Sequence, residues 1–396
     1  MTRDPWDEVL AQPAAVEALR TAVAGDEVGH AWLLVGPAGV GQVELVRAFT
    51  AALNCPEPDG GEDRGCGECT TCLRCLRGVH PAVVELEPEG ANHVVANVRE
   101  EWIPSASRTM TEGRRRVIRV VAADRMNEAA QNAFLKILEE PPPSVVWVLE
   151  AERESALLET VTSRCRRLDV MPWGPEAMRS LAARLDVPEA GREAVVRAAL
   201  GSPARLRDLA EADVAEARHR HLDVIDRLAE HGPGQVVPIA KELTTWAKAR
   251  TAVVKEANAA ELERLEEAYG VESNRGWPPG VRARLTRRFE RLERQEQRRA
   301  LGLVLDDLAS YLRDLLAAAS AGEAAVLVNV DHAIGVERDA GRLPTAALLD
   351  GLRAVDDCRD ALERNGSPEL HLERLLLRLA LPLYARHAAE RVVGGR

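Results

Sequence analysis

The chain has 396 residues, of which 46% are hydrophobic and 29% charged, and these values predict a soluble globular protein of about two or three domains. The net charge of −11 disfavours a protein that coats nucleic acid by bulk electrostatics, although it is compatible with local basic patches. No apolar run approaches the roughly 18–20 residues of a membrane helix, and the first residues contain no apolar signal-peptide core. We therefore expect a cytoplasmic protein with no membrane partner.

A glycine-rich loop stands near the start of the chain. Residues 5–24 predict a lead-in and an amphipathic helix, and residues 31–35 predict an apolar strand. The sequence Gly-Pro-Ala-Gly-Val-Gly-Gln-Val follows at residues 36–43 and leads into a helical pattern that ends near Asn54. Strand, glycine turn and helix form the context of a phosphate-binding loop, in which backbone N–H groups surround a phosphate at a helix N-terminus.

The loop lacks both residues that carry the chemistry of an ATPase. Gln42 stands where a lysine contacts the β- and γ-phosphates, and Val43 stands where a hydroxyl binds Mg²⁺. The three glycines of the pattern, Gly36, Gly39 and Gly41, are retained. Taken alone, the loop is either a chance glycine turn or part of a nucleotide fold that has lost its chemistry.

Five of the seven cysteines fall between positions 55 and 75, namely Cys55, Cys66, Cys69, Cys72 and Cys75. Their three successive C-x₂-C steps let short turns present thiolates to one tetrahedral Zn²⁺, and five cysteines compete for four places. A structural site is expected, because four thiolates leave no open position for a catalytic water. Free thiols or a redox pair are the weaker alternatives, since redox pairs usually come singly.

Strands alternate with helices over residues 30–170, which predicts a parallel, three-layer α/β domain. The expected strands are 83–86, 117–124 and 145–149, and the expected helices are 94–110 and one that Asn127 caps and that ends at Pro141. Asp124 stands where the acid of an ATPase would hold Mg²⁺, but Arg125 replaces the base that would follow it. A lone acid at a strand end is often a helix cap, so Asp124 is weak evidence by itself.

The remainder of the chain is helical in pattern. Residues 175–209 predict a small helical unit, and residues 215–396 predict helices throughout, interrupted by the turn at 276–280. The run 282–299 carries eight arginines against three glutamates. It is either a solvated helical face or a patch for nucleic acid or a protein partner.

Four segments together resemble the clamp-loader branch of the AAA+ ATPases, the loader subunits of the bacterial DNA polymerase III holoenzyme. They are His30-Ala-Trp-Leu-Leu-Val-Gly-Pro37, the cysteine knuckle after the loop helix, Asn132-Ala-Phe-Leu-Lys-Ile-Leu-Glu-Glu-Pro-Pro142, and Ser163-Arg-Cys165. The resemblance covers roughly residues 1–170, and the rest matches only in kind. It implies an α/β AAA+ core at 1–170 with a zinc knuckle at 55–75, a helical lid at 171–213, and an all-α collar for oligomerisation at 214–396.

The resemblance also assigns the sites. It implies Cys55, Cys66, Cys69 and Cys72 as zinc ligands, with Cys75 as a possible substitute. Four positions have lost the ATPase residues together: those of Gln42, Val43 and Arg125, and that of the sensor threonine, where Glu150-Ala-Glu152-Arg153 stands. The resemblance therefore implies a subunit with no ATPase activity of its own, on which ATP and Mg²⁺ are not expected.

In clamp loaders the arginine of Ser-Arg-Cys reaches across a subunit interface toward the γ-phosphate bound by a neighbour. Arg164, with Ser163 and Cys165 beside it, is thus implied as an arginine finger. The implied partners are the ATPase (tau/gamma) and delta subunits in a hetero-pentamer, the sliding clamp and primer–template DNA. The implied function is ATP-dependent clamp loading within a DNA-directed DNA polymerase, a nucleotidyltransferase holoenzyme.

Two alternatives belong to other classes. An active AAA+ clamp-loader ATPase or P-loop nucleotide kinase would bind ATP tightly, but the loop lacks the lysine and the hydroxyl. A zinc-ribbon DNA-binding protein would need basic residues around the cysteines, whereas acidic residues such as Glu68 prevail there.

Overall fold

The computed structural model describes residues 4–7, 9, 11–25, 27–56, 65–88, 90, 92–269, 281–364 and 366–394. The expected turn at 276–280 and most of the segment between Cys55 and Cys66 lie outside these residues. The chain forms two compact units, an N-terminal unit (Met1–Ala210) and a C-terminal unit (Glu211–Arg396), which are described separately.

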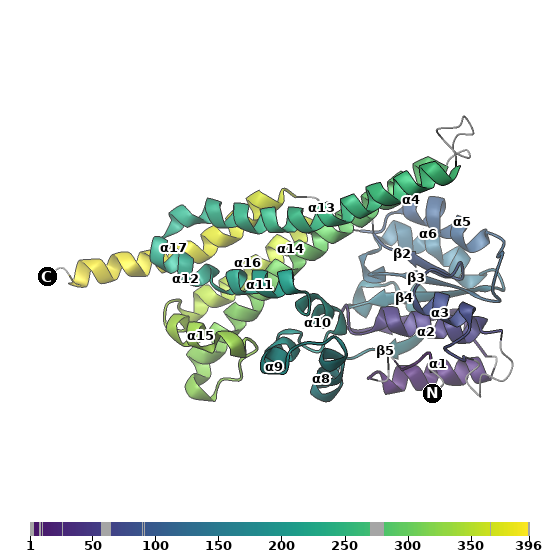
Figure 1. The fold of residues 1–396 in the computed structure, drawn as a ribbon, viewed down its shortest axis with the longest axis horizontal. Helices are drawn as coiled ribbons and strands as arrows, with labels where there is room; N and C mark the ends of the chain where they lie inside the picture. Colours follow the sequence, from purple (N-terminus) through teal and green to yellow (C-terminus); the bar gives the residue numbers. More distant parts are fainter. Residues whose placement is uncertain are drawn as a thin grey trace. The chain divides into compact units, whose positions relative to one another are not determined.

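The N-terminal unit is built on a five-stranded parallel sheet with the strand order β2-β3-β4-β1-β5 (Figure 1). The strands are β1 (Ala31–Val35), β2 (Val83–Leu86), β3 (Arg116–Val120), β4 (Val145–Ala151) and β5 (Arg166–Asp169). Every residue of β3 and β4 is buried, as expected for central strands that are covered on both faces. The three strands predicted after the cysteines are thus present.

Helices cover both faces of this sheet. The helices of the unit are α1 (Pro13–Ala24), α2 (Gln42–Asn54), α3 (Thr70–Leu76), α4 (Val95–Asn97), α5 (Ile103–Ser107), α6 (Glu128–Glu139), α7 (Glu159–Thr162), α8 (Pro175–Arg184), α9 (Glu189–Ala198) and α10 (Pro203–Leu209). One apolar cluster joins α1 and α2 to the sheet through residues such as Leu19 and Phe49. A second joins α6 and the π-helical turn Val98–Trp102 to the other face, where Phe134 lies 4.8 Å from Trp147 between ring centroids. The predicted three-layer α/β domain is therefore confirmed.

The predicted strand 117–124 is too long. Strand β3 ends at Val120, Ala122 takes a left-handed conformation with φ of 50°, and a 3₁₀ turn covers Ala123–Arg125. The apolar run continues past the strand because Ala123 is buried in the core beside the sheet, although it lies in the turn and not in the strand. Asp124 consequently lies on a turn beyond the strand. The predicted cap of α6 is confirmed, since Asn127 accepts a hydrogen bond from the Ala130 N–H at 2.8 Å.

The small helical unit predicted at 175–209 is present as α8, α9 and α10, and it belongs to the same compact unit as the sheet. The division into a core at 1–170, a lid at 171–213 and a collar at 214–396 stays a prediction. We keep the name lid for α8–α10.

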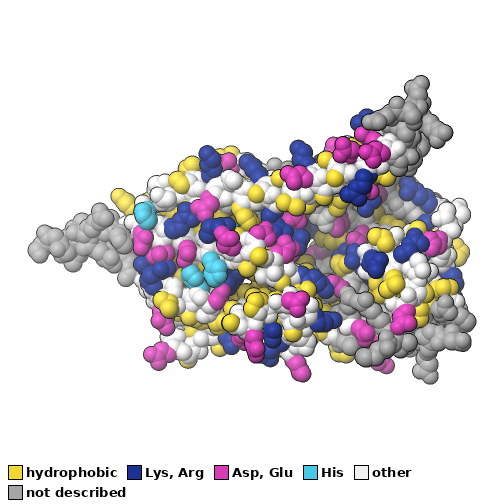
Figure 2. Space-filling model, in the orientation of Figure 1, with side chains coloured by type: hydrophobic (Ala, Val, Ile, Leu, Met, Phe, Trp, Pro, Cys, Tyr) yellow, Lys and Arg dark blue, Asp and Glu magenta, His cyan; other side chains and the backbone are white. Residues whose placement is uncertain are grey.

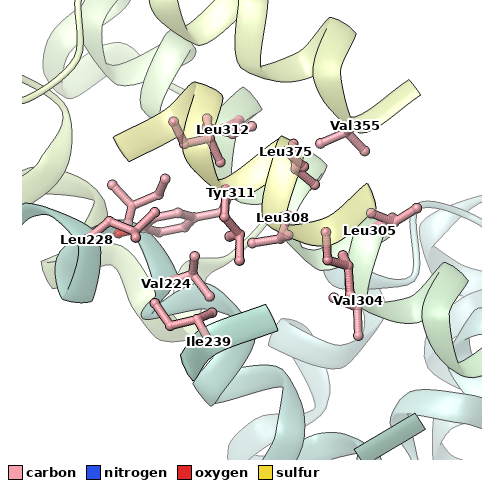
Figure 3. Close-up of a cluster of buried hydrophobic side chains, with 14 of the residues drawn as sticks. Val224, Leu228, Ile239, Val304, Leu305, Leu308, Tyr311, Leu312, Val355 and Leu375 are labelled. Atoms are coloured by element: carbon pink, nitrogen blue, oxygen red, sulfur yellow. The ribbon is translucent and has the colours of Figure 1, made fainter. Parts of the chain in front are cut away.

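In the residues that the structure describes, the C-terminal unit contains helices and no strand, as predicted. Its helices are α11 (Ala212–Leu222), α12 (Val224–His231), α13 (Val236–Tyr269), α14 (Val281–Ala321), α15 (Ala333–Asp339), α16 (Thr345–Glu363) and α17 (Pro368–Gly394). Figure 3 shows its core, in which Leu308 and Leu312 of α14 meet Leu228 of α12 and Leu375 of α17. None of the helices in the described part of the chain is both long and apolar enough to cross a membrane. On the face drawn in Figure 2, acidic and basic side chains are interspersed.

Candidate functional site

The glycine loop closes on the side chain of Gln42. Gly39 and Gly41 take φ values of 76° and 110°, which favour glycine, and α2 begins directly after them. The Gln42 Oε1 accepts a hydrogen bond from the Val40 N–H at 3.0 Å, and its Nε2 donates to the Pro37 carbonyl at 2.6 Å. Gln42 is only 4% exposed, so its amide lies inside the loop rather than in solvent.

A second side chain reaches the loop from the residue that follows strand β4. The Glu152 Oε1 accepts a hydrogen bond from the Ala38 N–H at 3.0 Å. Backbone N–H groups before a helix N-terminus are the groups that bind a phosphate in such loops, and a carboxylate is an anion of the same sign. Two of the loop's N–H groups are thus bonded to side chains of the protein itself.

The lid and Trp173, which precedes α8, also hold the loop. The Ser202 hydroxyl donates to the Gly39 carbonyl at 2.9 Å, and the Trp173 indole N–H donates to the Val40 carbonyl at 2.7 Å. Arg207 of α10 forms an ion pair with Glu44 of α2 at 2.6 Å. These contacts tie α8–α10 and the loop into one packed region.

The sheet carries a buried ion pair that sequence reasoning missed. Arg119 on β3 donates to both oxygens of Glu150 on β4, with N–O distances of 2.5 and 2.9 Å. Burial raises the pKa of Glu150, and the facing guanidinium opposes that rise. The signal in the sequence was a charged residue within one apolar strand, Arg119, and another near the end of the next, Glu150, but only the strand order makes the two strands neighbours.

Asp124 is enclosed and partly unsatisfied. Its Oδ2 accepts a hydrogen bond from the Arg153 N–H at 3.3 Å, and the Arg153 guanidinium lies 3.9 Å away. Its buried Oδ1 has no hydrogen-bond partner among the described residues. The acid therefore lies beside residues that follow β4, in the place where the sensor threonine was expected.

Four cysteines come together after α2. The Sγ atoms of Cys55, Cys66, Cys69 and Cys72 all lie within 4.8 Å of one another. Cys55 is 3.6 Å from Cys66 and 3.9 Å from Cys69 between sulfurs, and Cys66 is 3.9 Å from Cys72. A tetrahedral zinc with Zn–S bonds of about 2.3 Å needs sulfurs about 3.8 Å apart, so the cluster fits this metal.

Backbone N–H groups donate hydrogen bonds to two of these sulfurs. The Cys69 N–H donates to the Cys66 Sγ at 3.3 Å, and the Cys72 N–H donates to the Cys69 Sγ at 3.4 Å. Burial alone would raise the pKa of the Cys66 thiol, but its backbone hydrogen bonds bring that pKa down to about 7. Cys75 is buried nearby and is not one of the four. The geometry thus brings together the set that the resemblance implied.

Arg164 lies in the turn between α7 and β5. Its guanidinium forms an ion pair with Glu139 of α6 at 2.6 Å and donates to the Thr160 carbonyl at 2.7 Å. The side chain is 36% exposed. Cys165 next to it donates to the Val161 carbonyl at 3.4 Å, and burial raises its pKa to about 12, so this thiol packs rather than reacts. Ser163 ends α7.

Two family models match the chain. The family described as DNA polymerase III, delta subunit, matches residues 11–173, and the one described as DNA polymerase III, delta subunit, C terminal, matches residues 293–380. The first matched segment contains the glycine loop, the four cysteines and Arg164. The second contains α14 from residue 293 on, α15, α16 and the first part of α17.

The chain is also similar to curated subunits of DNA polymerase III. The DNA polymerase III subunit delta′ of Pseudomonas aeruginosa is 33% identical over 50% of this chain and 61% of that protein. The subunit delta′ of Bacillus subtilis is 31% identical over 46% of this chain and 54% of its own length. The subunit gamma/tau of Mycobacterium tuberculosis is 29% identical over 50% of this chain and 35% of that protein. The chain thus spans less than two-thirds of the length of these relatives.

Proposed function

Because the chain belongs to the family of DNA polymerase III delta-prime subunits, we propose that it is a non-catalytic, stator-like subunit of the clamp loader. In this role it supports the ATP-dependent loading of the sliding clamp on primed DNA. Its partners are then the tau/gamma ATPase and delta subunits of a hetero-pentamer, and its own loop binds no nucleotide.

The glycine loop is the observation that carries this proposal. Gln42 satisfies the Val40 N–H, Glu152 satisfies the Ala38 N–H, and the lid bonds the Gly39 carbonyl through Ser202. A nucleotide phosphate would have to displace the Glu152 carboxylate and would meet no lysine to offset its charge. The missing lysine and the side chains bonded to the loop therefore both disfavour nucleotide binding.

Arg164 is the residue that we propose for catalysis in trans. A guanidinium stays charged at any physiological pH and donates to phosphate oxygens in bidentate fashion. In the single chain its charge faces Glu139, at 2.6 Å. An exposed pair of this kind contributes little stability, so the guanidinium can leave Glu139 for a γ-phosphate at a small cost. Glu139 then serves to hold the arginine in place before assembly.

We further propose that the four cysteines hold a structural zinc. The cluster packs against the end of α2, where the Cys72 Sγ lies 3.9 Å from the Ala51 carbonyl. Four thiolates would complete the coordination of the metal, which leaves no position for a substrate. The zinc therefore stabilises the knuckle and the helix beside it.

The test compares reconstituted clamp loaders that contain the wild-type chain, Arg164→Ala or the matched control Arg167→Ala. Arg167 is exposed on β5, three residues away, and pairs with Asp169 at 2.8 Å. We expect all three complexes to assemble, and only Arg164→Ala to lose the part of the DNA-stimulated ATPase that comes from the neighbouring site. Full ATPase activity with Arg164→Ala would refute the finger assignment.

An active ATPase remains the rival, because half of the chain is also similar to a gamma/tau subunit. Titration calorimetry of the isolated chain with ATP separates the two. We expect no heat of binding, and micromolar affinity would overturn the silent-site proposal.

A further inference from the structure

Helices α13 and α14 form a long antiparallel hairpin within the C-terminal unit, and Figure 1 shows them side by side. Their contacts define the inner face of α14. The Asn258 amide of α13 donates to the Phe289 carbonyl and to Glu293 of α14, both at 3.4 Å. Nearer the core, Arg250 pairs with Glu296 at 3.0 Å. The glutamates at 293 and 296 thus turn toward α13.

The opposite face of α14 carries a row of arginines. Arg287, Arg291, Arg294 and Arg298 are spaced by four, three and four residues, which aligns them along one side of an α-helix. At about 100° per residue, this side lies opposite the contacts with α13. Arg287 and Arg294 are exposed, and Arg291 and Arg298 are half-exposed. The row spans about 17 Å of helix axis.

We propose that this arginine row binds the phosphate backbone of duplex DNA. The choice of nucleic acid rests on the proposed function, whereas the row itself rests on the geometry of the hairpin. Duplex DNA presents about one phosphate per 1.7 Å of its axis, so cations spaced by about 4.5–6 Å each meet a phosphate. Guanidinium groups are well suited because they bind phosphate in bidentate fashion.

Two other ligands fit the row less well. Single-stranded nucleic acid is bound largely by stacking on aromatic side chains, and Phe289, the nearby aromatic residue, belongs to the face toward α13. A stable protein interface is centred on buried aromatic or arginine anchors, whereas the four arginines of the row are exposed or half-exposed. Phosphate contacts need neither feature.

The rest of the protein would repel DNA. With a net charge of −11, the chain has no general attraction for a polyanion, so contact is confined to the local basic surface. Residues 287 and 291 also precede the matched segment 293–380, so half of the row lies outside both family models. The family models therefore include only Arg294 and Arg298 of the row.

The test measures binding of the full chain to a fluorescein-labelled 30-base-pair duplex by anisotropy, at salt concentrations from 50 to 200 mM. Each phosphate contact contributes a slope of about −0.9 to the plot of log K against log salt, so four contacts predict about −3.6 and about a 150-fold loss of affinity over this range. The quadruple variant R287Q/R291Q/R294Q/R298Q is expected to lose this slope. Glutamine keeps a similar helix propensity, and circular dichroism checks the fold.

A matched control removes the same charge elsewhere. R184Q/R313Q/R353Q/R364Q replaces four exposed arginines on other surfaces and is expected to bind as the wild type does. The double variant R287Q/R294Q, which changes the structure less, is expected to lose about half of the slope.

The proposal is overturned if the quadruple variant binds the duplex with unchanged affinity and slope, or if the control loses as much. It is also overturned if poly-glutamate competes as well as duplex of equal charge, since the row would then serve an acidic protein. Because the isolated chain is used, failure here is distinct from failure of the clamp-loader proposal, which ring assembly and ATPase activity test.

Discussion

Replacement of Gln42 by alanine tests whether the glycine loop is held by its own side chain. The substitution removes the acceptor of the Val40 N–H and the donor to the Pro37 carbonyl. Both bonds stay within eight residues of sequence, so their loss loosens the loop without touching the sheet. We expect a folded but destabilised protein.

The magnitude follows from the burial of the groups involved. Val40 is 2% exposed, so its N–H would lose its partner in a place that solvent scarcely reaches. An unsatisfied buried donor costs about 1–3 kcal/mol, and the second hydrogen bond contributes about 1 kcal/mol. Gln42→Ala should therefore lower the free energy of unfolding of the N-terminal unit by about 2–4 kcal/mol.

Urea unfolding followed by tryptophan fluorescence measures this change, because five of the seven tryptophans lie in the N-terminal unit. The control is Glu17→Ala on the exposed face of α1, for which a change within about 0.5 kcal/mol is expected. A loss below about 0.5 kcal/mol for Gln42→Ala, with an unchanged m-value, would show that the amide does not hold the loop.

Three further results are expected. Purified protein should contain one zinc by elemental analysis. The Cys72→Ser variant should lose the zinc and have a lower Tm, whereas Cys75→Ser should keep it. Zinc retained by Cys72→Ser would remove that residue from the ligand set. Arg119→Met should lower the free energy of unfolding by urea by about 3–5 kcal/mol, because it leaves the Glu150 carboxylate buried without a partner. The double variant Arg119→Met/Glu150→Met should recover most of this loss. Equal instability of the single and double variants would contradict the pairing. Burial lowers the pKa of His93 below its ordinary 6.5, so the unfolded state binds more protons below that pH and the stability falls as the pH drops from 6.5. The loss of unfolding free energy between pH 7.5 and 5.5 should thus be smaller for His93→Gln, and an equal loss would exclude this histidine as a cause.

The sequence by itself determined the features that depend on local pattern. Apolar runs of strand length, separated by helical periodicity, predicted the parallel α/β domain, because a strand covered on both faces leaves no polar alternation. The spacing of the cysteines predicted a zinc knuckle, since C-x₂-C steps are short enough to place sulfurs together without the rest of the fold. The loss of the lysine and the hydroxyl at Gln42 and Val43 could likewise be read directly from the loop.

The tertiary structure decided what joins distant parts of the chain. Glu152 reaches the loop, and Arg119 meets Glu150, because the crossovers of the sheet place β4 beside both β1 and β3. A charged residue in an apolar strand gives no sign of its partner, since pairing depends on strand order and register rather than on separation in sequence. The sequence did not show that β3 ends at Val120, before Asp124, because the chain stays apolar and buried beyond the last residue that pairs in the sheet. In the same way, the arginines of α14 became a row only when the contacts with α13 fixed which face of the helix points inward.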